Sequence, residues 1–238
     1  MLPSLIKDLQ SKKNLKKAKV LQKFFKTGKG EYGEGNFFLG LTSKQIKNIA
    51  KKYIGLSLKK VSQLLKSKVH EYRVCALRIL VLKHNKADEN ERARIFNFYL
   101  ENSEKINNWD LVDLSAPNIV GNFLFDKEKD ILYKFAKSHN LWKKRIAIVS
   151  TYYFIKQNEF SDTLRISEIL MKDKHDLIHK AVGWMLREVG KRNPKIEKNF
   201  LKGYYKTMPR TMLRYAIEKF PEVERKKWLK GGNLIPSI

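Results

Sequence analysis

The stretch Asn107-Asn108-Trp109-Asp110-Leu111-Val112-Asp113-Leu114-Ser115-Ala116-Pro117 lies near the middle of the chain and predicts a short helix. Either asparagine can cap its first turn with a side-chain oxygen. Pro117 predicts its end, because proline lacks a backbone donor and clashes with the preceding turn. Trp109 and Asp113 lie roughly 40° apart on one helix face, and Leu111, Val112 and Leu114 are expected to pack on the other. An indole beside a carboxylate fits a ligand site, but it also fits a core anchor beside an ion-pair partner.

The remaining sequence is also helical in pattern, with apolar residues at intervals of three and four. We expect helices over residues 3–13, 14–27, 44–54, 58–66, 70–84, 88–100, 126–138, 142–155, 163–171, 177–191, 196–205, 209–219 and 221–229. No segment has the sustained period-two alternation of a strand. The predicted fold class is therefore all-α.

A weak internal repeat runs through these helices. Small residues lie inside buried-looking helices at Ala76, Ala147 and Gly183, which are 71 and 36 residues apart. These spacings correspond to two periods and one period of about 36 residues, and the Trp109 helix falls near the missing middle repeat. Small residues allow close helix packing, and tandem helix pairs at this period are typical of an α-solenoid. We expect a single domain over residues 1–238, with a concave basic cleft for an extended ligand.

The composition favours a polyanionic partner. The 238 residues include 50 Lys and Arg against 24 Asp and Glu, which gives a net charge of +26. Nucleic acid is the first candidate, because phosphate contacts relieve the self-repulsion and release counterions. An anionic membrane surface is the second, and a solvated lysine-rich surface without a polyanionic partner is the third possibility.

Other features limit the location and the chemistry of the protein. No apolar run is long enough to cross a membrane, and the lysines within residues 1–20 argue against a secretory signal. Cys75 is the only cysteine, which fits a reducing cytoplasm, and its apolar neighbours predict inert core. His175 and His179 have a zinc-like spacing, but Asp176 replaces the usual glutamate and no third ligand is evident. We therefore predict no metal site.

The glycine-dense segment 27–36 formally matches a dinucleotide fingerprint at Gly28, Gly30 and Gly33. That fingerprint requires a preceding strand and a helix that begins immediately after it. Here a helix precedes the glycines, and Glu31 and Glu34 would repel a phosphate. A flexible or ligand-facing loop is the better interpretation.

Four motifs in order resemble the AlkD-type DNA glycosylases, a family with a HEAT-like repeat fold that removes alkylated purines. They span residues 108–113, 142–147, 184–191 and 209–220, and the resemblance extends from Phe37 to Pro221. It implies an active cleft formed by Trp109, Trp184, Asp113 and Arg145. Where some relatives have an N-terminal tyrosine, this chain has Phe24 or Phe25. Without the resemblance, Arg145 with Asp113 reads as a structural salt bridge and Trp142 as buried packing.

The implied activity is that of a monofunctional glycosylase that excises N3- or N7-alkylated purines, such as 3-methyladenine and 7-methylguanine, from duplex DNA. Asp113 would stabilise the oxocarbenium-like sugar, with no base flipping, no cofactor and a monomeric protein. Candidate phosphate contacts are Lys26, Lys29, Lys191, Arg192, Arg210 and Arg214. Two alternatives remain: a non-catalytic repeat protein that binds distorted or branched nucleic acid, and a protein-interaction scaffold.

Overall fold

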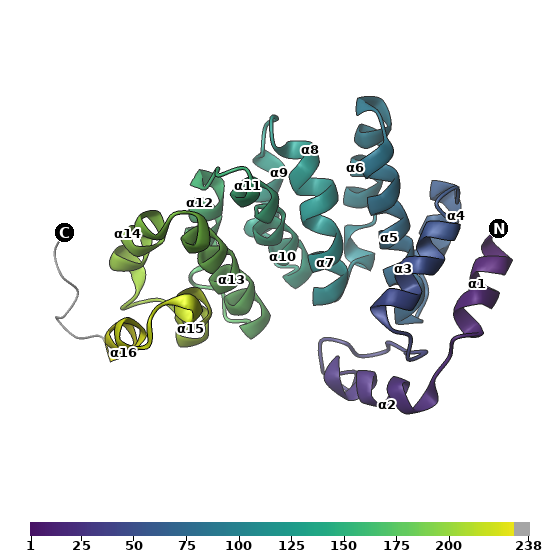
Figure 1. The fold of residues 1–238 in the computed structure, drawn as a ribbon, viewed down its shortest axis with the longest axis horizontal. Coiled ribbons are helices and arrows are strands. Elements are labelled where there is room, and N and C mark those ends of the chain that lie inside the picture. The colour runs from purple at the N-terminus through teal and green to yellow at the C-terminus, as the bar shows by residue number, and fades with distance from the viewer. Residues whose placement is uncertain (231–238) are drawn as a thin grey trace. The chain divides into compact units, whose positions relative to one another are not determined.

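The computed structural model describes residues 1–230, and this part of the chain consists of helices joined mostly by short connections, with one long connection over residues 25–42 (Figure 1). Its only β-type pairing is a parallel bridge between Phe37 and Val69. The prediction of an all-α fold is confirmed. None of these helices is long and apolar enough to cross a bilayer.

The chain divides into two compact units, one over Met1–Phe123 and one from Leu124 onward. The expectation of a single domain stays a prediction, and residues 231–238 of that domain lie outside the described part. In each unit, most helices pack against helices that are close to them in the chain, which is the arrangement of an α-solenoid.

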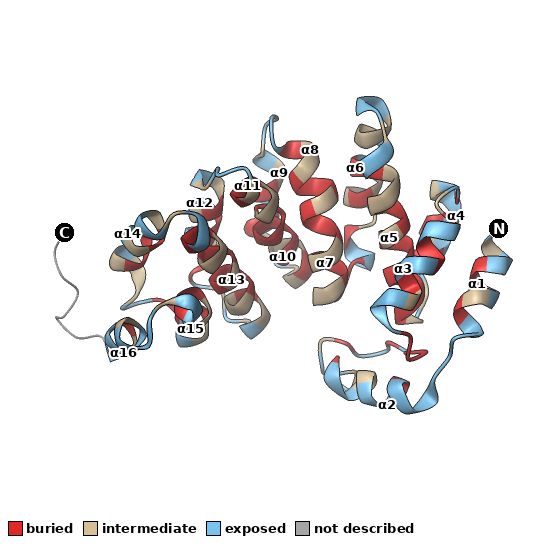
Figure 2. Ribbon diagram, viewed as in Figure 1, coloured by how far each residue is buried: buried red, intermediate tan, exposed pale blue. Residues whose placement is uncertain are grey.

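Unit 1 is organised around α5, which contacts α3, α4 and α7. The residues of α5 are largely buried, whereas α2 buries only Ala18 and is otherwise mostly exposed (Figure 2). The elements of this unit are α1 (Leu2–Gln10), α2 (Leu15–Phe24), α3 (Ser43–Lys52), α4 (Leu58–Leu65), α5 (His70–Lys86), α6 (Glu89–Glu101), η1 (Ser103–Lys105), α7 (Trp109–Ala116), η2 (Pro117–Gly121) and α8 (Asn122–Leu124), in which the division falls.

The short helix α7 begins as the sequence predicts, because the Asn108 side chain accepts a hydrogen bond from the Trp109 amide at 2.8 Å. It ends at Ala116, but Pro117 does not end the helical path: a wider π-turn, η2, and then α8 follow directly. Proline in the first turn of η2 leaves no donor unpaired. The expected apolar side is confirmed at Leu111 and Val112, which are fully buried.

A buried carboxylate fixes the segment between α2 and α3. Glu71, from α5, accepts hydrogen bonds from the amides of Leu39, Gly40 and Leu41 at distances of 2.7 to 3.3 Å. Gly40 has a φ of +87°, and a Cβ there would lie 2.2 Å from the carbonyl oxygen of Asn14. Only glycine fits this position, where the segment passes close to the start of α2.

Unit 2 is organised around α13, which contacts α10, α12, α14 and α15. Two predicted helices differ from the structure. The helix expected over 126–138 is shorter, and the one expected over 142–155 is divided at Thr151, whose hydroxyl donates to the Ile148 carbonyl at 2.7 Å. The elements of this unit are α9 (Asp130–Ala136), α10 (Leu141–Ser150), α11 (Tyr152–Lys156), α12 (Ser161–Leu170), α13 (Asp176–Arg192), α14 (Pro194–Tyr204), α15 (Arg210–Ala216), η3 (Ile217–Lys219) and α16 (Glu222–Lys230).

The small residues of the predicted repeat are in the positions that close packing requires. Ala76 and Ala147 are fully buried in α5 and α10. Gly183 lies where α13 meets α15, and a Cβ there would be 2.4 Å from the Met212 carbonyl oxygen and 2.5 Å from the Tyr215 Cβ. Helix α15 therefore packs directly on the backbone of α13.

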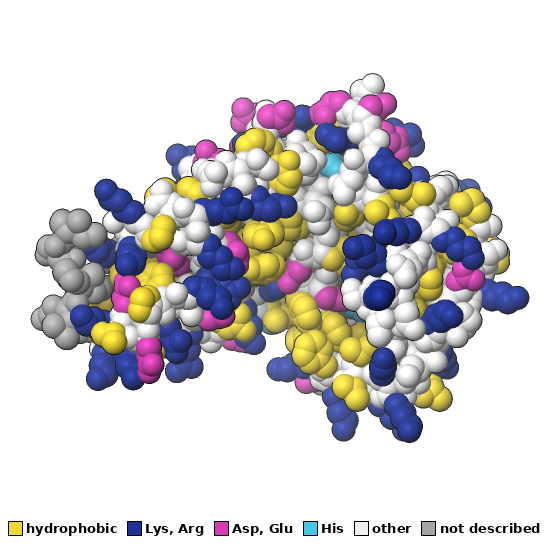
Figure 3. Space-filling view, viewed as in Figure 1, with side chains coloured by type: hydrophobic (Ala, Val, Ile, Leu, Met, Phe, Trp, Pro, Cys, Tyr) yellow, Lys and Arg dark blue, Asp and Glu magenta, His cyan; other side chains and the backbone are white. Residues whose placement is uncertain are grey.

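Cationic side chains are spread over both units rather than concentrated in a tail (Figure 3). The predicted phosphate contacts stay a prediction. All six are exposed: Lys26, Lys29, Lys191, Arg192, Arg210 and Arg214.

Candidate functional site

Unit 1 contains an open cavity of about 370 Å³, lined by side chains from α2, α3, α5, α7 and the segment after α2. Aromatic side chains and carboxylates share its wall, among them Phe25, Phe38, Trp109, Asp110 and Asp113. The sequence placed Trp109 and Asp113 on one face of a helix, and both line this cavity. Leu114, expected on the opposite face, also lines it, so the cavity side of α7 is wider than predicted.

Three aromatic residues from the end of α2 and the segment after it hold the Trp109 indole in place. The Phe25 ring stacks on it with centroids 5.0 Å apart and planes 12° apart. Phe24 meets it edge-on at 5.9 Å, and the indole Nε1–H donates to the Tyr32 hydroxyl at 3.3 Å. The two candidate aromatics thus differ in role: Phe25 is buried in the stack, whereas Phe24 is 62% exposed.

The glycine-dense segment forms the loop that brings Tyr32 to the indole. Its glutamates satisfy its own backbone, because the Glu31 carboxylate accepts from the Gly28 amide and the Glu34 carboxylate from the Gly30 amide, each at 2.8 Å. The amides that a phosphate would need are already bonded to carboxylates, which agrees with the rejection of a dinucleotide site.

Asp113 lies near a buried tyrosine behind α7. The Ser115 hydroxyl donates to the Leu111 carbonyl, so the Tyr99 hydroxyl is the donor in its 2.9 Å bond to Ser115. Burial raises the pKa of the Tyr99 phenol above its ordinary value, and the negative charge of Asp113 contributes to the rise. The Tyr99 phenol therefore stays neutral beside this wall of the cavity.

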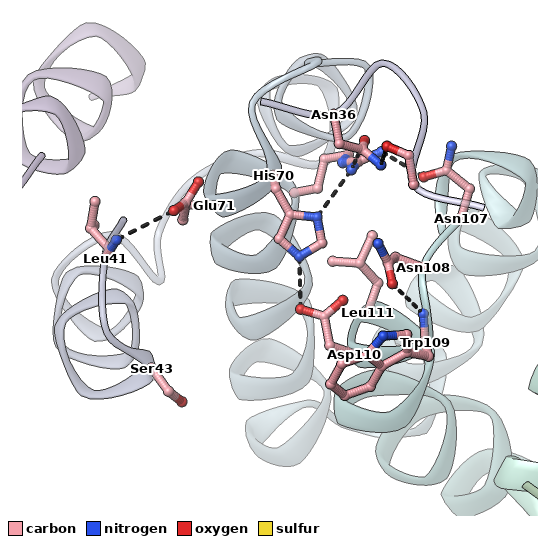
Figure 4. Close-up of polar contacts among 12 residues, drawn as sticks. Asn36, Leu41, Ser43, His70, Glu71, Asn107, Asn108, Trp109, Asp110 and Leu111 are labelled. Atoms are coloured by element: carbon pink, nitrogen blue, oxygen red, sulfur yellow. Dashed lines mark hydrogen bonds and ion pairs between the residues drawn. The ribbon is translucent and has the colours of Figure 1, made fainter. Parts of the chain in front are cut away.

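A polar network next to Trp109 was not predicted from the sequence (Figure 4). His70 Nε2 lies 2.7 Å from Asp110 Oδ2, and the Arg73 guanidinium donates to His70 Nδ1 at 3.1 Å. Arg73 also donates to Asn107 Oδ1 at 2.5 Å and to Asn36 Oδ1. Two of these contacts join α5 to the α7 region: His70 with Asp110, 40 residues apart, and Arg73 with Asn107, 34 residues apart. Local spacing in the sequence cannot reveal pairs at this separation. The only local signal was Asp110, adjacent to Trp109 in the central motif.

The other two predicted site residues belong to unit 2. Trp184, on α13, donates from Nε1 to Glu188 at 3.2 Å, and its ring lies 5.8 Å from that of Tyr152. Arg145, on α10, is only 5% exposed and donates to the Leu177 carbonyl at 2.6 Å. That these two residues act together with Trp109 and Asp113 stays a prediction.

Four other residues discussed above have surroundings that fit a structural role: Trp142, Cys75, His175 and His179. Trp142 is buried. Cys75 is buried in α5, and burial raises the pKa of its thiol to about 12, so it is an unreactive core residue. His175 caps α13 by accepting from the Leu177 amide at 3.1 Å, and His179 Nε2 lies 2.5 Å from the Asp173 carbonyl oxygen.

An α-solenoid with a large excess of positive charge and an aromatic, acidic cavity defines a helical-repeat protein suited to nucleic acid. The sequence model of the family described as DNA alkylation repair enzyme matches residues 5–220, and the chain belongs to this family. The description of the family says that its members are enzymes, and repair of DNA alkylation implies that DNA is their binding partner. No curated protein matches the chain in sequence.

Solved structures show the same fold. The structure is similar to that of a predicted DNA alkylation repair enzyme from Enterococcus faecalis, with a TM-score of 0.69, 16% identity and coverage of 89% of this chain and 98% of that chain. It is also similar to AlkD2 from Streptococcus mutans, with a TM-score of 0.55, 20% identity and coverage of 86% and 97%. The protein smu.31 from Streptococcus mutans UA159 matches with a TM-score of 0.54, 22% identity and coverage of 75% and 92%.

Proposed function

We propose that the protein is a monofunctional DNA glycosylase that hydrolyses the N-glycosidic bond of cationic N3- or N7-alkylated purines in duplex DNA. Typical substrates are 3-methyladenine and 7-methylguanine. The observation that carries the proposal is the placement of Trp109 and Asp113 on the wall of one cavity, in a chain that belongs to the DNA alkylation repair enzymes.

The chemistry suits a carboxylate and an indole. An alkylated purine is positively charged, so it leaves with the bonding electron pair and becomes neutral without a proton from the protein. The positive charge that develops on the sugar is stabilised by the Asp113 carboxylate. Water attacks the anomeric carbon, and Asp113 is the group that can orient this water and accept its proton. The indole face of Trp109 adds a cation–π attraction of about 0.5–2 kcal/mol.

The remaining site residues have supporting roles in this proposal. Trp184 offers a second indole to the cationic nucleoside, and Arg145 orients Asp113 or contacts a phosphate. The exposed residues Lys26, Lys29, Lys191, Arg192, Arg210 and Arg214 contact the DNA backbone. As in the enzymes it resembles, the base reacts without rotation into a pocket. We further propose that the enzyme acts as a cytoplasmic monomer without a cofactor.

The test is release of free 7-methylguanine from methylated duplex DNA by the wild type, Asp113→Asn and Asp126→Asn. Asp126 is a matched control, because it is an exposed carboxylate in the other unit that pairs with Lys127. We expect release by the wild type and the control, and a loss of about a hundredfold or more in Asp113→Asn. Salt-dependent DNA binding by the wild type without any release of base would refute the glycosylase proposal and favour a binding protein.

A further inference from the structure

His70 stands at the junction of the polar and aromatic parts of the cavity wall. It is the first residue of α5, it is 2% exposed, and it faces the first turn of α7 (Figure 4). Its contact with Asp110 joins α5 to the residue next to Trp109. Because Asp110 lies in the first turn of α7, this bond fixes the turn from which the Trp109 side chain projects.

The hydrogen bonds around His70 define its tautomer. A guanidinium has only donors, so the contact from Arg73 requires that His70 Nδ1 accept. The proton of the neutral ring is therefore on Nε2 and is donated to Asp110 Oδ2. Burial lowers the pKa of Arg73 to about 10, and the nearby Asp110 carboxylate partly opposes this shift by raising the pKa. Arg73 therefore remains a charged donor at neutral pH.

The same imidazole also supports the aromatic stack. It lies 4.6 Å from Phe38 in a stacked arrangement and 5.1 Å from Phe25. Phe25 in turn stacks on Trp109. His70 is therefore linked to Trp109 in two ways. Its hydrogen bond to Asp110 holds the α7 backbone next to Trp109, and its ring contacts Phe25, which stacks on Trp109.

We propose that His70, as the Nε2–H tautomer, is a positioning residue of the site: it holds Asp110, and with it the α7 turn that presents Trp109 and Asp113 to the cavity. Asp110 acts here as an acceptor that anchors the helix. This inference rests on the proposed function, because it assigns a role within the same site.

Two substitutions separate the two hydrogen bonds of the ring. In His70→Gln, the amide nitrogen lies near the position of Nε2 and can donate to Asp110. In His70→Asn, the shorter amide reaches only the position of Nδ1, so it can accept from Arg73 but cannot reach Asp110. Both variants lose the aromatic contacts equally, which makes each the control for the other.

We expect kcat for 7-methylguanine release to be about tenfold or more higher in His70→Gln than in His70→Asn, because both variants lose the ring contacts and only glutamine keeps the bond to Asp110. His70→Asn should lose about tenfold to a hundredfold in kcat with an unchanged KM for DNA, because misplacement of a reacting group lowers kcat rather than binding. Equal kcat values for the two variants would overturn the inference, and so would a loss confined to KM.

Hydrogen exchange provides a readout that does not depend on catalysis. The amides of residues 109–113 should exchange faster in His70→Asn than in His70→Gln, with equal exchange in α13 as the internal reference. Equal exchange at residues 109–113 would refute the positioning role. Absence of base release by the wild type would refute the proposed glycosylase function instead, and the exchange experiment would still decide the role of His70.

Discussion

The contact between α13 and α15 gives the sharpest stability prediction, for Gly183→Ala. The added Cβ would lie 2.4 Å from the Met212 carbonyl oxygen, whereas ordinary contact begins at 3.4 Å. Helix α15 therefore has to retreat by about 1 Å, and overpacking of this kind costs about 1–3 kcal/mol. Alanine recovers about 1 kcal/mol of helix propensity. We expect a net loss of up to about 2 kcal/mol, or up to about 8 °C in Tm.

The matched control for this prediction is Gly203→Ala in α14. Gly203 is exposed, and a Cβ there has no atom within 4 Å, so the same substitution should stabilise the protein by about 0.5–1 kcal/mol. Urea and thermal unfolding, followed by circular dichroism, measure both variants. The two substitutions should have opposite signs. If Gly183→Ala is as stable as Gly203→Ala, the close helix contact does not exist as described.

The remaining predictions concern a buried acid, the aromatic stack and the basic loop. Burial raises the pKa of Glu197 to about 8 from 4.5, so the folded state retains a proton that the unfolded state loses, and stability falls by up to ~1.4 kcal/mol per pH unit over this window. Glu197→Gln should remove this slope, as measured by urea unfolding at pH 5, 6.5 and 8. Phe25→Ala removes the ring stacked on Trp109 and should destabilise unit 1 by about 3–5 kcal/mol, whereas a change below 1 kcal/mol in thermal unfolding would contradict the stack. The double change of Lys26 and Lys29 to Gln should lower the salt slope of log Kd for duplex DNA by about 2 in a fluorescence titration, and an unchanged slope would remove both residues from the interface.

Local patterns predicted where the helices lie and several of their starts, because caps and apolar periodicity act within a few residues. Some ends were wrong: α1 ends at Gln10 and α2 at Phe24, each three residues before the predicted end. Thr42 forms a capping box with Gln45, and the Asp88 side chain accepts from the Glu91 amide at 2.9 Å, as a helix start there requires. The division of the helix expected over 142–155 was missed, because the side-chain bond of Thr151 to the backbone leaves no mark on hydrophobic spacing.

The candidate site was predictable only in part. The spacing of Trp109 and Asp113 along one helix was sufficient to place both on one face, and the cavity lies on that face. The partners of Asp110 and Glu71 were missed for a different reason. Each is bonded to a residue or segment at least 30 residues away in sequence, and such pairs are set by the packing of α5 against α7 and against the segment after α2.

The stack of Phe25 on Trp109 covers one face of the indole. Under the proposed function, a nucleoside that stacks on this ring has to do so on the face opposite Phe25. In that proposal, recognition at Trp109 is one-sided before any base edge is read.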